Sequence, residues 1–439
     1  MNIIGLRKEE KPFETRVPVI PEHVRLLTSK HKINFVVEPS EQRAFNADEY
    51  KDAKAEILPL KGSPAQVILG IKEMPGHFFE PGKTYVFFSH TIKGQHHNMP
   101  MLKSIITAKG TLIDYERILD DKGKRLIFFG NWAGMAGLSD TLRIFGQRLD
   151  IEHIRPNPFK RVKPTLKCKD LTELKEAFAA LAKQIEIEGL PRRLCPFIVG
   201  FAGYGNVSRG AQELFDMLPH KSIEPSDIQH ATPDRNLLYK CVFREEHTVE
   251  PIDPTSRFDL QDYYEHGKTK YKAVFEKYIP YLTILLNCIY WSDKYPRLVS
   301  KDFIRSHWTD KLRKLRVVGD ISCDIEGAIE FTLTATNPAS PAFTYLVKKN
   351  RIVGGVSGEG PVVMAVDNLP SELPRESSAS FSTSLLEYIP SLANADFSVP
   401  FEILDLPREL KDAIIVYQGN LTKNYDYLRQ YLNNQETGT

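Results

Sequence analysis

Three short apolar runs near the start of the chain each end on a side chain that can move a proton. The runs span residues 67–71, 85–89 and 111–115, and they lead into Lys72 and Glu73, His90, and Glu116. Runs of about five mostly apolar residues with polar ends predict buried strands. Ligands bind beyond the carboxyl ends of the strands in an open α/β sheet, so we expect these side chains to converge on one crevice. One strand that ends on a charged residue can be explained by the strand reaching water at that point. Three such strands in succession indicate acid–base chemistry.

Strand and helix patterns alternate through the first part of the chain, and this βαβ rhythm predicts a mostly parallel sheet. Later segments show helical periodicity, further strands and a stretch rich in Ser, Pro and Glu that is typical of a surface loop. The expected strands are 2–6, 33–37, 195–201, 282–290 and 315–321; the expected helices are 21–29, 98–108, 138–153, 171–185, 211–218 and one amphipathic helix within 405–439; the expected loop is 371–385.

A glycine-rich turn follows the strand at 195–201 and leads into a helix, which is the setting of a dinucleotide-binding fingerprint. Gly203 would make the tight turn, and Gly205 would let the backbone approach a pyrophosphate at the helix N-terminus. The fingerprint places its third glycine at position 208, where this chain has Ser208, and the next glycine is Gly210. A tight turn without a ligand is therefore the alternative interpretation.

The composition is that of an ordinary globular protein of 439 residues, long enough for two domains, with 42% hydrophobic and 26% charged residues. The 58 Lys and Arg residues nearly balance the 56 Asp and Glu residues, so nothing points to nucleic acid or an anionic membrane as a partner. The charged N-terminus resembles no signal or transit peptide, and no apolar run reaches the ~18 residues of a membrane span. Five scattered cysteines without a CxxC pair indicate a reduced, cytoplasmic chain with no metal site.

Ten short segments, in the same order along nearly the whole chain, give the sequence a family resemblance. They include LGIKEMP at 69–75, FSHTIK at 88–93 and GYGNVSRGAQ at 203–212. The chain resembles the lysine-forming saccharopine dehydrogenases and the lysine–2-oxoglutarate reductase domain of bifunctional lysine-degrading enzymes, which are relatives of alanine dehydrogenase. The other segments are RVP at 16–18, DYE at 114–116, GKR at 123–125, FGNWAG at 129–134, LNCIYW at 286–291, DISCD at 320–324 and VDNLP at 366–370.

The resemblance implies an α/β protein with two Rossmann-like domains, built on parallel sheets, that flank a central cleft. Residues 1–135 and 370–439 would form the substrate-binding, catalytic domain, and residues 136–369 the nicotinamide dinucleotide-binding domain. The implied reaction is the reversible reductive condensation of L-lysine with 2-oxoglutarate to saccharopine. Bifunctional relatives carry a saccharopine-cleaving domain after this region, so we expect that second activity to be absent. Small molecules would be the partners, with no nucleic acid and no membrane, and the oligomeric state stays open.

The resemblance also implies roles for single residues. Lys72 and His90 match the catalytic acid–base pair, and Arg16 and Arg125 match arginines that bind carboxylates. Alternatives from the residues alone are a Lys72–Glu73 surface ion pair, a hydrogen-bonded core histidine and a plain surface arginine at 125. The remaining implied residues are Glu73 and Glu116 lining the substrate site, Gly203, Gly205, Asn206, Val207, Ser208 and Arg209 at the dinucleotide, and Asp324 beside the nicotinamide, while Asp320 is read as a turn-forming aspartate.

Two observations point to different cofactors. Glu224 follows Gly205 by nineteen residues, where a carboxylate would hold a ribose hydroxyl, repel a 2′-phosphate and favour NAD. The lysine-degrading reductases, which use NADPH, share the glutamate at 224 and the turn, so Ser208 and Arg209 could instead contact the phosphate. We expect NADP(H), with NAD(H) as the alternative and no metal.

The sequence is also compatible with two other functions. One is an alanine-dehydrogenase-like enzyme that acts on another amino acid and releases ammonia. The other is a non-catalytic protein that senses a dinucleotide with the same fold. The persistence of Lys72, His90, Arg16, Arg125 and Asp324 in one chain argues against the second.

Overall fold

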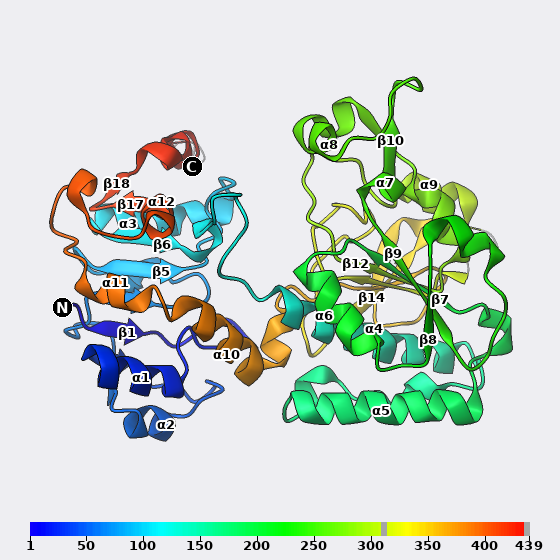
Figure 1. The fold of residues 1–439 in the computed structure, drawn as a ribbon, viewed down its shortest axis with the longest axis horizontal. Coiled ribbons are helices and arrows are strands. Elements are labelled where there is room, and N and C mark those ends of the chain that lie inside the picture. Colours follow the sequence, from blue (N-terminus) through cyan, green and yellow to red (C-terminus); the bar gives the residue numbers. More distant parts are fainter. Residues whose placement is uncertain (309–313, 434–439) are drawn as a thin grey trace. The chain divides into compact units, whose positions relative to one another are not determined.

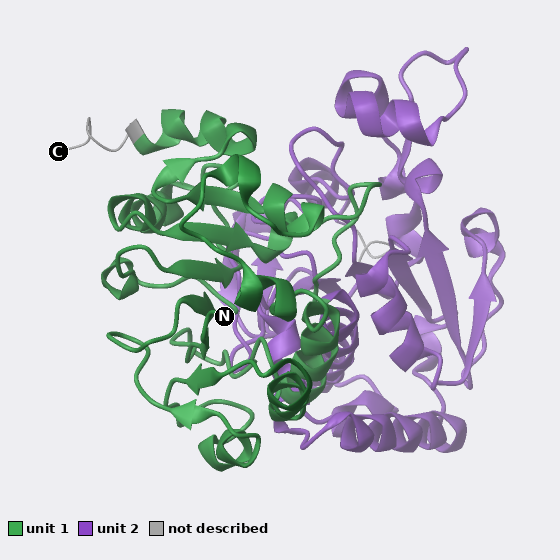
Figure 2. Ribbon diagram, turned by 60° about the vertical axis from the view of Figure 1, so that its left-hand side comes forward, with its two compact units in different colours: residues 1–129, 374–439 green, residues 130–373 purple. Residues whose placement is uncertain are grey.

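The computed structural model describes residues 1–308 and 314–433 and forms two compact units. Unit 1 consists of residues 1–129 and 374–439, and unit 2 of residues 130–373 (Figure 2). Helix α4 (Gly130–Ile151) opens unit 2, so residues 130–135, assigned to the first domain from the sequence, lie in the second unit. Residues 370–373 do so as well.

Unit 1 is built on one eight-stranded sheet, with the strand order β18-β17-β6-β5-β4-β1-β2-β3 (Figure 1). The strands from β1 to β6 are parallel, which confirms the predicted parallel sheet. The antiparallel pair β17–β18 was not predicted as strand. The bounds are β1 (Ile4–Leu6), β2 (Phe35–Val37), β3 (Glu56–Ile57), β4 (Val67–Leu69), β5 (Thr84–Phe87), β6 (Thr111–Asp114), β17 (Ile414–Tyr417) and β18 (Asn420–Leu421).

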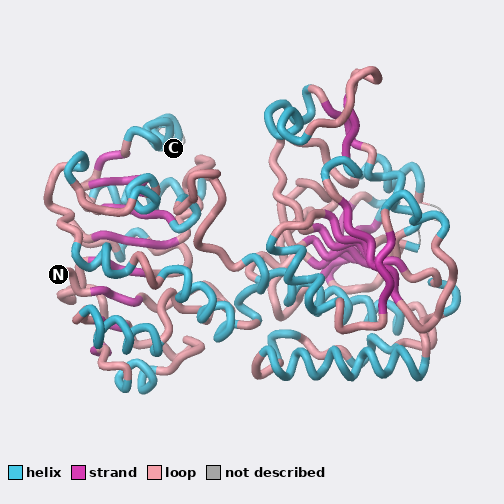
Figure 3. Tube along the Cα trace, viewed as in Figure 1, coloured by secondary structure: helices cyan, strands magenta, loops and turns pink. Residues whose placement is uncertain are grey.

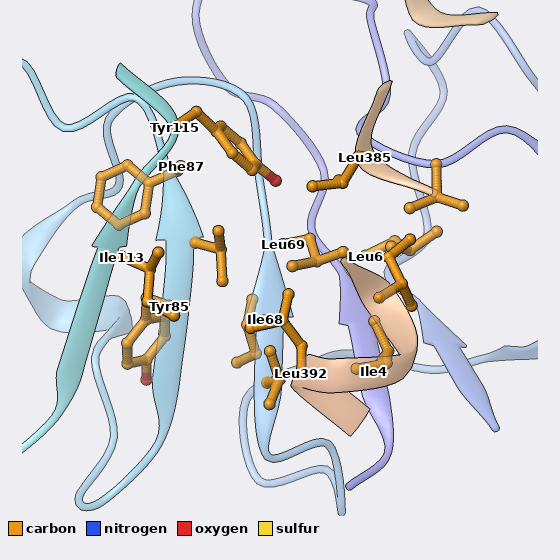
Figure 4. Packing of buried hydrophobic residues seen from close by; sticks show 14 of the residues in the cluster. Ile4, Leu6, Ile68, Leu69, Tyr85, Phe87, Ile113, Tyr115, Leu385 and Leu392 are labelled. Atoms are coloured by element: carbon orange, nitrogen blue, oxygen red, sulfur yellow. The ribbon is translucent and has the colours of Figure 1, made fainter. Parts of the chain in front are cut away.

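Helices from both ends of the chain pack in unit 1. Leu385 and Leu392, which belong to helices near the C-terminus, point into the same hydrophobic cluster as Ile4 and Ile68 of the central strands (Figure 4). The core is therefore shared between segments far apart in the sequence. The helices are α1 (Pro21–His31), α2 (Ala47–Asp52), α3 (Met99–Thr107), α10 (Pro374–Leu385), α11 (Ile389–Asn394), α12 (Arg408–Asp412) and α13 (Arg429–Asn433).

The expected surface loop at 371–385 is wrong, because most of it is helix α10. Two of its serines do not face water: Ser378 and Ser382 are buried and accept hydrogen bonds from the backbone N–H groups of Val17 (3.0 Å) and Ile20 (3.1 Å). Phe381 joins the core on the same side of the helix. Two of the serines that made this segment resemble a loop thus accept hydrogen bonds from buried backbone N–H groups of another segment.

Unit 2 is built on a second eight-stranded sheet, with the order β15-β14-β16-β13-β12-β7-β9-β8. Strand β7, the first in the sequence, lies between β9 and β12, so the chain reverses its direction of travel across the sheet at β7. Ligands of doubly wound sheets bind at such a switch point. The bounds are β7 (Ile198–Ala202), β8 (His220–Ile223), β9 (Leu238–Phe243), β12 (Ile284–Asn287), β13 (Val317–Asp320), β16 (Val362–Met364) and the antiparallel β14 (Ala342–Leu346) and β15 (Arg351–Gly354).

Helix α4 packs tightly on helix α6 (Asn206–Phe215) within unit 2. A Cβ atom at Gly134 would lie 1.9 Å from the carbonyl oxygen of Val207, and one at Gly210 would lie 2.0 Å from that of Asn131. Glycines at both positions therefore permit the contact between the two backbones. The other helices of the unit are α5 (Leu171–Glu188), α7 (Glu245–Thr248), α8 (Leu260–His266) and α9 (Lys301–His307).

A small lobe follows β9 and α7. It contains β10 (Val249–Pro251), α8 and β11 (Tyr271–Ala273), and its two antiparallel strands stand apart from the large sheet (Figure 3). Val249, Tyr263 and Tyr271 form a separate apolar cluster there. We call residues 249–273 the tyrosine lobe.

Within the described ranges, no helix is long and apolar enough to cross a membrane. Nor do these described residues contain a group of three His, Cys, Asp or Glu side chains that could hold a metal ion.

Candidate active site and dinucleotide site

The strand-end residues of unit 1 follow three neighbouring parallel strands, β4, β5 and β6. Lys72 and Glu73 come after β4, His90 after β5 and Glu116 after β6, so all four lie at the same edge of the sheet. Nδ1 of His90 is hydrogen-bonded to Oε1 of Glu73, and both side chains are about one-third exposed, at 34% and 30%. A lysine, an imidazole and two carboxylates are thus gathered at this edge.

His90 is held by its surroundings in an uncommon backbone conformation. Its φ is 48°, in the left-handed region that non-glycine residues seldom adopt and that costs roughly 1–3 kcal/mol where it occurs. The side-chain amide of Asn98 donates to the carbonyl oxygen of His90 (3.0 Å), and the preceding residue, Ser89, donates its backbone N–H to buried Asp114 (3.1 Å). Burial raises the pKa of Asp114 to about 6, although hydrogen bonds from Ser89 and Glu116 act in the other direction.

Lys72 is half-buried, and its environment disfavours its charged form. Burial lowers the pKa of Lys72, and the nearby positive charge of Arg16 lowers it further. The backbone is fixed by Glu9, whose two carboxylate oxygens accept from the N–H groups of Ile71 (2.7 Å) and Lys72 (3.0 Å). Burial first, and then the charge of Glu14, raise the pKa of Glu9 to about 7. A lysine with a lowered pKa can act as a general base near neutral pH.

Glu73 stays ionised beside these groups. Burial would raise its pKa, but the hydrogen bond and the charge of His90, together with Lys72, outweigh burial and lower the pKa of Glu73 to about 2. Its carboxylate is therefore a fixed negative charge between the two candidate proton carriers.

Arg16 is buried, with 4% of its surface exposed, and is paired with Glu14. Its Nε and one terminal nitrogen donate to the two oxygens of Glu14 at 2.7 and 2.5 Å, and its guanidinium lies 4.1 Å from the ring centre of Phe129. Burial would raise the pKa of Glu14, but the adjacent Arg16 keeps it low. The other terminal nitrogen is the one that Glu14 does not engage.

Arg125 is more exposed, at 45% of its side chain, and donates a hydrogen bond to Glu116. The backbone N–H of Glu116 in turn donates to Asp114 (2.8 Å), which links the pair to the end of β6. Exposed ion pairs contribute only about 0–1 kcal/mol, so an incoming carboxylate could exchange partners with this one at little cost.

The glycine turn of unit 2 has the geometry expected of a phosphate-binding turn. Gly203 has a φ of 96°, and a Cβ there would lie 3.1 Å from Ile289 and 3.2 Å from the carbonyl oxygen of Cys288. Gly205 precedes helix α6 as its N-cap, and a Cβ there would meet nothing within 4 Å. Gly203 is therefore required by the protein's own backbone, whereas the space beside Gly205, at a helix N-terminus, suits a phosphate.

The other residues of the predicted fingerprint lie in the first turns of α6. Asn206 and Val207 are half-buried, whereas Ser208 is fully buried and its hydroxyl accepts from the side-chain amide of Gln212 (2.9 Å). Arg209 is exposed, and its Nε donates to the carbonyl oxygen of Tyr204 (3.4 Å). The structure thus turns Ser208 away from solvent, and Gly210 supplies the close packing that the third glycine of the fingerprint usually supplies.

A hollow of about 370 Å³ lies at the carboxyl ends of β7, β9 and β12. It is bordered by Gly203, Gly205 and residues that the sequence analysis did not single out, above all Arg244 and Glu245, which follow β9. The signal for them was the run at 238–243, an apolar strand pattern that ends on charged residues. The full lining is Gly203, Tyr204, Gly205, Phe243, Arg244, Glu245, Thr248, Tyr263, Tyr264, Cys288, Ile289, Tyr290 and Tyr295.

Glu224 does not line this hollow, contrary to the prediction from its spacing. It follows β8, and β8 is an edge strand separated from β7 by β9. Its charge acts instead on Cys241 and His247: it adds to the burial that raises the pKa of Cys241, and it opposes the burial that lowers the pKa of His247. The spacing assumed that the next strand in the sequence is also the next strand in the sheet, and this chain inserts β9 between them.

The two aspartates at the end of β13 and in the turn after it differ in their surroundings. Asp320 is buried and accepts from the side chains of Asn287 (2.8 Å) and Thr332 (2.6 Å), and burial raises its pKa to about 6. These bonds tie three segments together at the end of β13, a structural role for Asp320. Asp324 is half-buried in the turn that follows, and its place beside the nicotinamide stays a prediction.

The sheet order and the glycine turn define unit 2 as a dinucleotide-binding fold. Residues 5–136 match the alanine dehydrogenase/PNT N-terminal domain, and residues 248–424 match the alanine dehydrogenase/PNT C-terminal domain. The chain belongs to the alanine dehydrogenase/PNT family. An L-alanine dehydrogenase structure covers 98% of the chain with a TM-score of 0.61 at 16% identity, and 99% of that structure is matched, which shows the common fold.

Relatives with more similar sequences carry names from lysine metabolism. An alpha-aminoadipic semialdehyde synthase of Arabidopsis thaliana is 37% identical over 97% of this chain and 41% of its own length. A protein of Schizosaccharomyces pombe named saccharopine dehydrogenase (NAD+, L-lysine-forming) is 28% identical over 90% of this chain and 94% of its own length. The chain thus spans less than half of the plant relative and nearly all of the yeast relative.

Proposed function

We propose that the protein is a lysine–2-oxoglutarate reductase, a lysine-forming saccharopine dehydrogenase that condenses L-lysine with 2-oxoglutarate reversibly to saccharopine. The observation that carries this proposal is the arrangement of Lys72 and the hydrogen-bonded pair His90–Glu73 at one sheet edge. The names of the similar plant and yeast proteins support it. Unit 1 would bind the substrates and unit 2 the dinucleotide, in the cytoplasm.

The condensation needs several proton transfers, and Lys72 and His90 would share them. The ε-amine of the substrate must lose a proton before it attacks the keto carbon, and the carbinolamine must then lose its hydroxyl as water. Lys72, with its lowered pKa, can accept a proton as a neutral amine. His90, oriented through Nδ1 by Glu73, can donate a proton from Nε2 to the departing hydroxyl.

The two carboxylates of 2-oxoglutarate need cationic partners. Arg16 would use the terminal nitrogen that Glu14 does not engage, and Arg125 would exchange Glu116 for a substrate carboxylate. Glu116, once released, and Glu73 would then face the ammonium groups of the lysine substrate. A dicarboxylate is thus favoured over a monocarboxylate such as pyruvate.

The residues of unit 2 fit a nicotinamide dinucleotide. The open space at Gly205, the N-terminus of α6 and the hollow beside them accept a pyrophosphate and an adenosine. Such a cofactor would supply the hydride that reduces the imine. NADP(H) is the proposed form, because Arg244 borders the hollow whereas Glu224 does not. The name of the yeast relative points to NAD+, so the test must include both nucleotides.

The proposal is tested by following the oxidation of NADPH and NADH by the purified protein. We expect oxidation only when L-lysine and 2-oxoglutarate are both present, with saccharopine as the product by mass spectrometry. Equal turnover with ammonia and pyruvate would favour an alanine-dehydrogenase-like enzyme. Nucleotide binding without turnover on any of these pairs would favour the non-catalytic sensor.

A further inference from the structure

The end of β9 presents two opposite charges to the hollow, Arg244 and Glu245. A carboxylate at the end of the strand beside β7 would bind the adenosine ribose hydroxyls and exclude a 2′-phosphate, whereas an arginine there accommodates the phosphate. Which of the two charges meets the nucleotide is therefore decisive for its identity, and their side-chain partners distinguish them.

Glu245 is held by the tyrosine lobe. The hydroxyl of Tyr264 donates to Oε1 of Glu245 over 2.7 Å, and the hydroxyl of Tyr204 also interacts with this carboxylate. Tyr264 is positioned by its neighbour Tyr263, which packs edge-on against Tyr271 at 5.3 Å between ring centres and at a tilt against Tyr295 at 5.2 Å. Because Tyr263 is buried in the cluster of the lobe, the hydrogen bond to Glu245 starts from a well-packed support.

Arg244 is placed differently. Its guanidinium lies 5.5 Å from the ring centre of Tyr204, which sits between the two glycines of the phosphate turn. Among residues 1–308 and 314–433, no carboxylate forms an ion pair with Arg244 within 4 Å. The side chain is exposed, so its charge is available on the side of the hollow where the turn begins.

We propose that the tyrosine lobe selects the phosphorylated dinucleotide: Tyr264 holds Glu245 back, and Arg244, stacked on Tyr204, binds the 2′-phosphate. This inference rests on the proposed dinucleotide site of unit 2. A carboxylate bonded to a phenol has one fewer acceptor for ribose hydroxyls. A guanidinium binds a phosphate through charge-assisted hydrogen bonds.

Direct binding of NADP+ and NAD+ to the full chain, measured by isothermal titration calorimetry without lysine or 2-oxoglutarate, tests this inference. Arg244→Ala should weaken NADP+ binding about 10- to 100-fold and change NAD+ binding less than about twofold, since only the phosphate loses its partner. Arg351→Ala is a matched control, because Arg351 is an exposed arginine of unit 2 on β15. An equal loss for both nucleotides with Arg244→Ala would overturn the inference.

The role of the lobe is tested by Tyr264→Phe, which keeps the ring and removes the hydroxyl. The preference for NADP+ over NAD+ should fall about fivefold or more, because the released carboxylate can then reach the ribose and repel the phosphate. Adding Glu245→Gln to this variant should restore the preference. Tyr427→Phe is the matched control, since its hydroxyl also makes one hydrogen bond (2.6 Å) and the residue belongs to unit 1. An unchanged preference in Tyr264→Phe would overturn the inference.

These experiments separate the two proposals. The readout is nucleotide affinity alone, so a protein that binds NADP+ through Arg244 but does not oxidise NADPH with lysine and 2-oxoglutarate would sustain this inference and refute the proposed reaction. A protein that catalyses the reaction with NADH and with NADPH equally well, and keeps its nucleotide affinities in Arg244→Ala, would do the reverse.

Discussion

His90 and Glu73 are joined by a hydrogen bond although seventeen residues separate them and each follows a different strand. The bond is possible because β4 and β5 are parallel neighbours, which brings their carboxyl ends to the same edge. It occupies Nδ1 of the imidazole, so Nε2 is the nitrogen available to exchange protons with a substrate.

The first prediction concerns the two proton carriers themselves. Lys72→Met and His90→Gln should each lower kcat by about 10²–10⁴-fold, the usual size of a general acid–base contribution. Steady-state kinetics with lysine, 2-oxoglutarate and NADPH would measure this loss. Nucleotide affinity should be unchanged, because both residues belong to unit 1. Wild-type turnover in Lys72→Met would show that Lys72 does not transfer protons in the reaction.

Glu73 should act by positioning His90 rather than by reacting. Glu73→Gln keeps the size of the side chain but replaces the charge-assisted hydrogen bond to His90 with a neutral one. We therefore expect kcat to fall about 10- to 100-fold. The pH–rate profile should change shape as well, because the fixed negative charge next to both proton carriers is removed. A loss of thermal stability with an unchanged pH–rate profile would show that the residue is merely structural.

Buried Glu9 should make stability depend on pH. Its pKa in the folded protein is raised from 4.5 to about 7, so the folded state binds more protons than the unfolded state between these values. The contribution of Glu9 is therefore fully present below pH 4.5 and is lost as the pH rises through about 7, by up to about 3 kcal/mol. Unfolding midpoints of the wild type and Glu9→Gln at pH 5 and pH 8 would test this.

The wild type and Glu9→Gln are compared by the change of their unfolding midpoints between pH 5 and pH 8. The absolute midpoints are not compared, because glutamine removes one of the two acceptors of backbone N–H groups at any pH. The variant should lose less stability than the wild type between pH 5 and pH 8. Parallel curves for the two proteins would contradict the raised pKa of Glu9.

Two glycines of the phosphate turn should respond differently to the same change. Gly203→Ala should destabilise unit 2 by about 1–2 kcal/mol, because its φ of 96° disfavours a side chain. Gly205→Ala should fold normally, since its added Cβ meets nothing within 4 Å, yet bind the dinucleotide about tenfold more weakly because that space is needed by the pyrophosphate. Thermal unfolding and nucleotide titration of both variants separate the two effects, and unimpaired binding by Gly205→Ala would count against the site.

The serines of α10 should matter for stability. Ser382→Ala removes the acceptor of the buried backbone N–H of Ile20 and should cost about 1–3 kcal/mol. Ser380→Ala, on the exposed side of the same helix, should change stability by less than about 0.5 kcal/mol. Chemical unfolding compares them, and equal effects would show that the hydroxyl of Ser382 contributes nothing specific.

Strands β1, β2, β4, β5 and β6 of unit 1 were predictable because each is a short apolar run that ends on a polar residue. The parallel direction of β4, β5 and β6 then brings the four strand-end side chains to one edge. The order of strands in unit 2 was not predictable in this way. Spacing along the chain suggested Glu224, but pairing between β7 and β9 depends on contacts that no local pattern records. Arg244 and Glu245, which line the hollow at the end of β9, are therefore the residues that we propose for the ribose end of the site.

Helix α10 was missed for a related reason. Serine and proline favour turns when water is their only partner. Here the partners are amides of residues 17 and 20, more than 350 positions earlier in the chain, and only the folded structure supplies them. The C-terminal strands escaped prediction in the same manner, since β17 is defined by its pairing with β6.

The edge pairing of β17 with β6 also sets an order of assembly on the ribosome. Residues 1–129 are synthesised first, yet β6 lacks its neighbour and Ile4 and Ile68 lack the helices that cover them until residues 374–421 have emerged. Unit 2 is continuous in the sequence and can complete its own sheet in the meantime. The domain made first is thus finished last, and during that interval its exposed apolar strands are the part of the nascent chain that a chaperone would bind.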